Sequence, residues 1–109
     1  MTKYILRDSG ENVYVFRSVE DLDGWVEAID VAGGEYVGWD DSGQRLELIP
    51  TDSGHVLVRG SGRDETQVLT RTLRQYVEKV SEYHEQAVPN HARWAVQELV
   101  DWVEAANRD

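Results

Sequence analysis

The fold of this chain is decided by the stretch EYVGWDDSGQRLELIPTDSGHVLVR, residues 35–59. Two Asp-Ser-Gly tripeptides, at positions 41–43 and 52–54, separate three runs in which apolar and polar residues alternate. Alternation with a period of two is typical of strands, while Asp, Ser and Gly favour tight turns. The stretch therefore predicts a three-stranded antiparallel meander.

The two turns also predict which side chains share a face of the sheet. With Ser42 and Gly43 as the two central residues of the first turn, Trp39 lies opposite Leu46. The second turn, at 51–54, suits a type I turn with a bulge. This register gathers six apolar side chains on one face: Val37, Trp39, Leu46, Leu48, Val56 and Val58.

The other face of the meander mixes apolar and charged residues. In the predicted register Tyr36 lies against Ile49, and Leu57 joins them on that face. If water covers this face, its apolar members mark a docking or self-association surface. In the alternative arrangement the C-terminal helices cover it, and the sequence favours neither.

The same tripeptide occurs a third time at 8–10, between KYILR and NVYVFR. It predicts an N-terminal hairpin with Ser9 and Gly10 as the central residues. In that register four side chains share a face: Tyr4, Leu6, Val13 and Val15. The flanking strands share no further pattern, so the three tripeptides indicate similar turn chemistry rather than an internal repeat.

A helix is predicted between this hairpin and the meander. Ser18 is a good N-cap, and Gly33-Gly34 ends the helix. Its apolar stripe, widened on one flank by tryptophan, comprises Val19, Leu22, Trp25, Val26 and Ile29.

Two further helices follow the meander. The first is long and amphipathic, starting near Glu65 after a flexible Gly60-Ser61-Gly62 connection and ending or turning at Val88-Pro89. Asn90 caps the second, and we expect the two helices to form an antiparallel hairpin. Two tryptophans lie off the densest seam of the last helix, where each covers a neighbouring element or anchors a partner: Trp94 and Trp102.

The composition excludes several classes of protein. The 109 residues suit a single domain, 1–109, and the absence of cysteine excludes disulfides and thiolate metal sites. No apolar run approaches the roughly 20 residues of a membrane span, so we expect a soluble cytoplasmic protein. The net charge is −10, with −8 in residues 1–52. This charge argues against nucleic-acid and membrane binding and favours a basic partner, although solubility alone also explains it.

Four acidic residues recur at helical spacing beside the stripe of the first helix: Glu20, Asp23, Glu27 and Asp30. Like charges at these separations destabilise a helix by about 0.2–0.5 kcal/mol per pair. The row is therefore a candidate partner-binding surface, together with Asp40 and Asp41 in the first turn of the meander. A solvated face of a generally acidic protein is the alternative interpretation.

No constellation for catalysis, metal binding or cofactor binding is recognisable. His84 and His91 flank Pro89 and lack the i,i+4 spacing of a zinc-protease helix. His55 lies on a strand, where a surface role is expected. No serine stands in a Gly-x-Ser-x-Gly elbow, and no cysteine offers a nucleophile. We therefore expect no catalytic residue, no metal site and no cofactor.

The run VGWDDSGQRLELIP is followed by a short strand and by the helix pattern Leu-x-x-x-Leu-Arg-x-Tyr-Val at 69–77. This half of the chain resembles small acidic bacterial proteins of the immunity type, which inhibit secreted toxins. The resemblance implies a binding role in the cytoplasm, and an acidic surface set against a basic active site would agree with it.

Together these patterns predict an α+β domain of order ββαβββαα, with a mostly antiparallel five-stranded sheet and helices on one or both faces. The leading functional interpretation is a non-catalytic, acidic interaction protein that inhibits a basic partner protein. The alternative is a homodimeric structural or scaffold module, joined through Tyr36, Ile49 and Leu57 or through the tryptophans of the last helix. A small-ligand-binding or enzymatic role is third.

Overall fold

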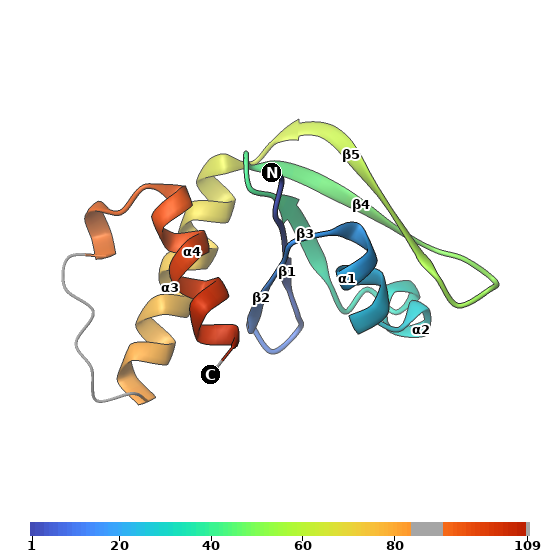
Figure 1. Cartoon of the computed structure of the whole chain (residues 1–109), viewed down its shortest axis with the longest axis horizontal. Helices are drawn as coiled ribbons and strands as arrows, with labels where there is room; N and C mark the ends of the chain where they lie inside the picture. Colours follow the sequence, from blue (N-terminus) through green and yellow to red (C-terminus); the bar gives the residue numbers. More distant parts are fainter. Residues whose placement is uncertain (84–90, 109) are drawn as a thin grey trace.

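The computed structural model describes residues 1–83 and 91–108, which form a sheet with helices on both faces (Figure 1). The strands are Tyr4–Arg7 (β1), Val13–Phe16 (β2), Val37–Asp40 (β3), Gln44–Pro50 (β4) and Val56–Asp64 (β5). The helices are Val19–Trp25 (α1), Ala28–Ala32 (α2), Thr66–Tyr83 (α3) and Val96–Asn107 (α4), with a 3-10 turn at His91–Arg93 (η1). All neighbouring strands pair antiparallel, in the order β2-β1-β3-β4-β5. The α+β class and the antiparallel five-stranded sheet are thus confirmed.

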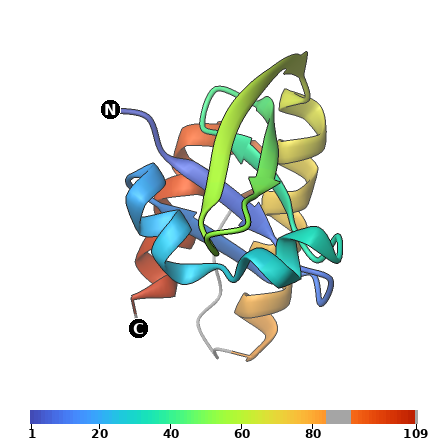
Figure 2. The same ribbon diagram turned by 90° about the vertical axis from the view of Figure 1, so that its right-hand side faces the viewer.

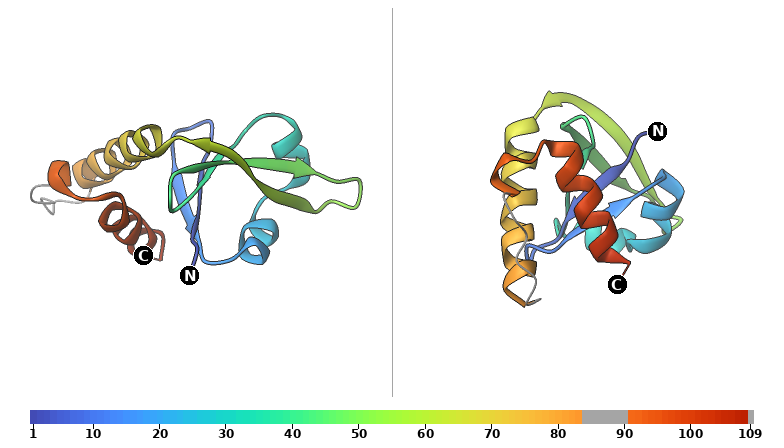
Figure 3. Two further views of the ribbon diagram at one scale, coloured as in Figure 1. Left: turned by 90° about the horizontal axis from the view of Figure 1, so that it is seen from above. Right: turned by 60° about the vertical axis from the view of Figure 1, so that its left-hand side comes forward.

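The first core lies between the sheet and the pair α3 and α4. Ile5, Val13 and Trp39 project from the sheet into this core. They meet fully buried residues of both helices: Leu69, Leu73, Val77, Leu99, Val100 and Val103. The helices therefore cover the β2-β1-β3 part of the sheet, while β4 and β5 extend away from them (Figures 1 and 3).

The second core lies on the opposite face, beneath α1 and α2 (Figure 3). Leu22 and Val26 pack there against Leu6 and Val56. Apolar residues from several strands and from α2 surround this cluster: Tyr4, Phe16, Ala28, Val31, Tyr36, Leu48 and Val58. The two helical pairs therefore bury both faces of the sheet, but over different strands.

The predicted register is wrong by one residue in two of the three hairpins. Trp39 pairs with Arg45, and Gly38 pairs with Leu46, so Trp39 and Leu46 lie on opposite faces. The cause is a loop of three residues rather than two, in which Gly43 takes a φ of 94°. The predicted face that joined Val37 and Trp39 to the other four apolar residues therefore does not exist.

The N-terminal hairpin shows the same shift. Leu6 pairs with Tyr14, and Ile5 pairs with Val15, so Leu6 and Val15 lie on opposite faces. In the third hairpin Leu48 pairs with Val58, as expected for a turn with a bulge. The predicted register of this hairpin is confirmed, because the turn predicted at 51–54 already included a bulge residue.

The helix predicted from Ser18 to Gly33 is two short helices. Ser18 caps α1 as expected, its hydroxyl accepting a hydrogen bond from the backbone N of Asp21 at 3.0 Å. The chain then becomes extended at Val26 and Glu27, with ψ of 154° and 134°. Leu22 and Val26 stay together in the second core, whereas Ile29, predicted to be in the stripe, is 76% exposed beyond the break.

The C-terminal helices also differ from prediction. The long helix is confirmed as α3, but α3 and α4 run in the same general direction rather than as an antiparallel hairpin (Figures 1 and 3). α4 starts at Val96, and the predicted break at Val88-Pro89 and the Asn90 cap lie outside the described residues. Both tryptophans cover a neighbouring element, since they pack against the first core: Trp94 and Trp102.

The Gly60-Ser61-Gly62 connection belongs to β5 instead of forming a loop. Gln44 shapes this end of the strand, because its side-chain Oε1 accepts a hydrogen bond from the backbone N of Gly62 at 2.8 Å. A Cβ on Gly60 would approach the Gln44 amide within 2.7–2.9 Å. A side chain at position 60 would therefore displace the flexible end of Gln44 and disturb its hydrogen bond to Gly62.

Candidate functional site

Four aromatic rings meet at the end of the sheet next to α1 and α2. The Trp25 ring, 45% exposed, lies at the centre of the group. Its centroid is 4.4 Å from that of Tyr14, 5.5 Å from Phe16 and 5.9 Å from Tyr36. Large aromatic side chains with one side open to water are typical binding anchors.

The local fold explains how these rings come together. Tyr14 and Phe16 alternate along β2 and point to the face that α1 covers. Trp25 is the last residue of α1, and the break at Val26 and Glu27 turns the chain toward Tyr36 before β3. The turn that joins β1 to β2 meets the segment before β3, because Ser9 Oγ donates to Oε2 of Glu35 at 3.4 Å, so the loops of this end converge (Figure 2).

Carboxylates surround the rings. Burial raises the pKa of the Tyr36 hydroxyl, and negative charge on nearby acidic residues raises it further: Asp30, Asp8, Glu35 and Glu27. Burial, with the charge of Asp8, also raises the pKa of Tyr14, whose hydroxyl donates to Asp8 Oδ2 at 3.2 Å. The four carboxylates and the rings Tyr14, Phe16, Trp25 and Tyr36 are called the Trp25 patch below.

The negative charge of the patch is not neutralised internally. Within residues 1–83 and 91–108, no ion pair joins a lysine or arginine to a carboxylate of the Trp25 patch. The side chains of Glu27 and Glu35 are exposed, and that of Asp30 is half-buried. A cationic group that approached Trp25 would therefore meet, beside aromatic faces, several carboxylates that have no lysine or arginine partner among the described residues.

The structure divides the predicted acidic row. Glu27 and Asp30 belong to the patch, whereas Glu20 is exposed in the first turn of α1. Asp23 points to the other side, where its Oδ1 accepts from the backbone N of Val56 at 2.7 Å. Its Oδ2 lies 2.9 Å from Nδ1 of His55. Asp23 thus holds α1 against the edge strand β5, and the predicted helical row is not one surface.

Asp40 and Asp41, the turn residues of the predicted partner-binding surface, lie at the end of β3 that is farther from Tyr36. The Asp40 carboxylate accepts hydrogen bonds from the backbone N of Ser42 and of Gln44, at 3.0 and 2.9 Å. The backbone carbonyl of Asp41 accepts from Nε2 of Gln97 at 2.9 Å. These two aspartates hold the turn and dock it on α4, away from the Trp25 patch.

The alternative interface is not a single face either. Ile49 pairs with Leu57, which is 57% exposed, on the side of β4 and β5 facing away from α1. Tyr36 packs on the other side, against the second core. The one-residue shift in the register separates Tyr36 from the other two.

Other chemistry is sparse in the described part of the chain. No group of three or more His, Asp or Glu residues is arranged to hold a metal ion there. His84 lies outside the described residues. None of the helices in residues 1–83 and 91–108 combines the length and hydrophobicity needed to cross a membrane.

Comparison of the chain with protein-family models, with curated proteins and with solved structures found no match. The geometry of the Trp25 patch and the charge of the chain are therefore the features that bear on function.

Proposed function

We propose that this protein is a non-catalytic interaction protein that binds a basic partner protein through the Trp25 patch. The half-exposed Trp25 ring carries the proposal, because it rests on three other rings among carboxylates that lack a cationic partner in the described part of the chain. Aromatic faces attract cations by about 0.5–2 kcal/mol, most strongly when the cation is desolvated. An arginine or lysine of the partner would lie over Trp25 and pair with Asp30 or Glu35.

The net charge of −10 supports the same partner class. A strongly negative surface accelerates the approach of a basic protein and repels nucleic acids and anionic lipids. Together with the resemblance to immunity-type proteins, this favours an inhibitor that covers the basic active site of a partner enzyme.

The first test of this function is an NMR titration of the whole chain with a capped Arg-Ala-Arg peptide. We expect the indole N–H signal of Trp25 to shift, and the citrulline counterpart of the peptide to shift it much less. The double variant Asp30→Asn/Glu35→Gln should weaken binding by about tenfold. The control Glu20→Gln/Asp52→Asn removes the same charge at exposed sites outside the patch and should change binding less than twofold.

Inhibition is tested with the basic product of a neighbouring reading frame. The wild-type chain should block its activity, and the Asp30/Glu35 double variant should do so less well than the Glu20/Asp52 control. Equal binding by the two double variants, or binding that does not weaken with salt, would contradict the assigned surface.

A further inference from the structure

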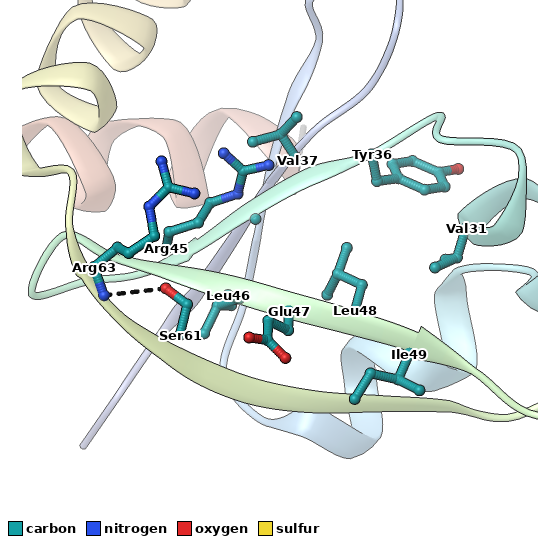
Figure 4. A pocket seen from close by; sticks show the side chains of 11 residues that line it. Val31, Tyr36, Val37, Arg45, Leu46, Glu47, Leu48, Ile49, Ser61 and Arg63 are labelled. Carbon is teal, nitrogen blue, oxygen red and sulfur yellow. Dashed lines mark hydrogen bonds between the residues drawn. The ribbon is translucent and has the colours of Figure 1, made fainter.

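β3 and β4 separate from each other within the sheet. They pair only at Gly38–Leu46 and Trp39–Arg45, whereas β4 stays paired with β5 to its last residue. Figure 4 shows the two strands diverging from the end where Arg45 lies toward Tyr36 and Ile49. A hollow of about 470 Å³ lies along this divergence.

Backbone groups of both strands point into the gap. The backbone N of Thr51 donates to the carbonyl of His55 at 2.9 Å, on the side of β5. Because the backbone groups of successive residues in a strand point to opposite sides, those of Ile49 also point toward β5, and those of Leu48 point toward β3. On the other strand the backbone N of Asp41 donates to the carbonyl of Lys3 at 3.0 Å, on the side of β1. By the same alternation the backbone groups of Trp39 and Val37 point toward β1, and those of Tyr36 point toward β4. Among the described residues, neither Tyr36 nor Leu48 has a backbone partner across the gap.

The narrow end of the hollow is positively charged. The side chains of Arg45 and Arg63 lie side by side there (Figure 4). Both reach the same carboxylate, with Arg45 3.4 Å from Oε1 of Glu65 and Arg63 3.0 Å from Oε2. The indole N–H of Trp39 also donates to Oε1 at 3.0 Å. One carboxylate cannot neutralise two guanidinium groups, and each retains N–H groups that no described residue occupies.

Beyond the two arginines the lining combines apolar side chains with the Glu47 carboxylate, which is paired with Arg59 on β5 (Figure 4). Val37 and Ile49 line the hollow on either side, and Val31 of α2 closes the wide end (Figure 4). Charge at one end, unpaired strand backbone in the middle and apolar side chains beyond are the features that recognise an extended peptide.

We infer that this gap binds a short extended segment of a second protein that carries a carboxylate. The carboxylate pairs with Arg45 and Arg63, the backbone of the segment bonds to Leu48 on β4, and an apolar side chain contacts Val37 and Ile49. This site has the opposite charge to the Trp25 patch. The two sites share Tyr36, whose ring belongs to the patch and whose backbone faces the gap, but the inference does not rest on the proposed function.

The probe is the capped peptide Val-Glu-Val-Glu-Val, added to the whole isotope-labelled chain at about 0.15 M salt. At that ionic strength, charges farther away than about 8 Å are largely screened, so the net charge repels the probe less. We expect amide signals of Tyr36, Gly38, Arg45 and Leu48 to shift. The glutamine counterpart of the peptide should bind at least about tenfold more weakly.

Variants separate the gap from general charge effects. Arg45→Gln/Arg63→Gln should weaken binding by about tenfold, while Arg71→Gln/Arg93→Gln removes the same charge at exposed sites and should leave it within twofold. Arg63 is 70% exposed, so Arg63→Gln alone should keep the fold and still weaken binding about threefold.

Signal shifts outside the gap, equal affinity for the glutamine peptide, or normal binding by Arg63→Gln would overturn the inference. Inorganic phosphate is titrated in parallel. If phosphate reproduces the shifts and the peptide does not, the site is an anion site and not a peptide groove.

Discussion

Asp8 and Asp40 hold two different hairpins with the same set of hydrogen bonds. Oδ1 of Asp8 accepts from the backbone N of residues 10 and 12, both at 2.9 Å. Oδ1 of Asp40 accepts in the same way from residues 42 and 44, at 3.0 and 2.9 Å. Each Oδ2 also accepts from the side-chain amide four residues on, in Asn12 and Gln44. Both aspartates therefore enclose three-residue loops of the same form.

This equivalence predicts that Glu11→Gly stabilises the protein. Glu11 is the third residue of its loop and has a φ of 63°, where the two other hairpins use Gly43 and Gly54. Left-handed backbone costs a residue with a side chain about 1–2 kcal/mol, part of which is offset because glycine is more flexible when unfolded. We expect a gain of about 0.5 kcal/mol in urea unfolding. Ser9→Gly, in the same loop without a positive φ, should not stabilise, and an equal gain there would contradict this explanation.

Gly43→Ala and Gly54→Ala should differ in cost. Both glycines have positive φ, of 94° and 86°, so each alanine carries about 1 kcal/mol of backbone strain. A Cβ on Gly43 would also meet Thr66 at 2.2–2.9 Å, whereas nothing lies within 4 Å of a Cβ on Gly54. We expect Gly43→Ala to destabilise by about 3 kcal/mol or more and Gly54→Ala by about 1. Equal losses in urea unfolding would show that the turn does not press on α3.

The stabilisation that the Glu104 carboxylate provides should be lost in acid. Hydrogen bonds from Arg17, at 2.9 Å, and then from Lys3, at 3.1 Å, lower the pKa of Glu104 to about 2 against the effect of burial. Because the folded pKa is below the ordinary 4.5, the stabilisation is complete above about pH 4.5 and is lost as the pH falls toward 2.

The loss is measured as the urea midpoint between pH 7 and pH 2.5. We expect Glu104 to contribute about 1–2 kcal/mol, because the Arg17 side chain is 55% exposed and solvent screens the pair. Glu104→Gln should flatten the pH dependence, whereas Asp101→Asn, at a carboxylate that is 64% exposed, should leave it almost unchanged. A steep acid transition that survives in Glu104→Gln would assign the effect to other carboxylates.

Replacing Asn107 by Asp at the outer edge of β2 should destabilise the protein. Its Oδ1 accepts from the backbone N of Val15 at 2.8 Å, and its Nδ2 donates to the carbonyl of Val13 at 3.1 Å. Only an amide does both, so Asn107→Asp loses the donor and places a carboxylate against a carbonyl. We expect Asn107→Ala and Asn107→Asp to destabilise by about 1 kcal/mol each in urea unfolding. A neutral Asn107→Asp would show that this edge needs only an acceptor.

The register errors show where local patterns are insufficient. A turn of two residues and one of three both suit Asp-Ser-Gly, and the choice moves every following side chain to the other face. For β3 and β4 the choice depends on Asp40, which bonds across the loop to Gln44. It also depends on contacts with α3, where Thr66 Oγ1 donates to the carbonyl of Ser42 at 3.3 Å. Residues 24 positions apart therefore decide the register.

The Trp25 patch could be predicted only in part. Its acidity and the acidic residues Glu27 and Asp30 follow from the sequence, but Trp25 itself is predicted to flank an uninterrupted helix. The break at Val26 and Glu27 changes that role. The break leaves Leu22 and Val26 buried together in the second core but takes Ile29, the next residue of the predicted stripe, out to 76% exposure. The alternation of Tyr14 and Phe16 on β2 is the one local signal of aromatic clustering.

Properties that depend on neighbouring residues are encoded locally in this protein. They include the positions of the turns, the Ser18 cap, the amphipathic α3 and the strong negative charge, because turn chemistry, capping and helical period act over a few residues. The faces of the sheet, the direction of α4, the aromatic cluster and the gap between β3 and β4 arise only on folding. Each depends on which distant groups share a buried space or a hydrogen bond, and the residues that make these contacts are too far apart in the chain for any local pattern to relate them.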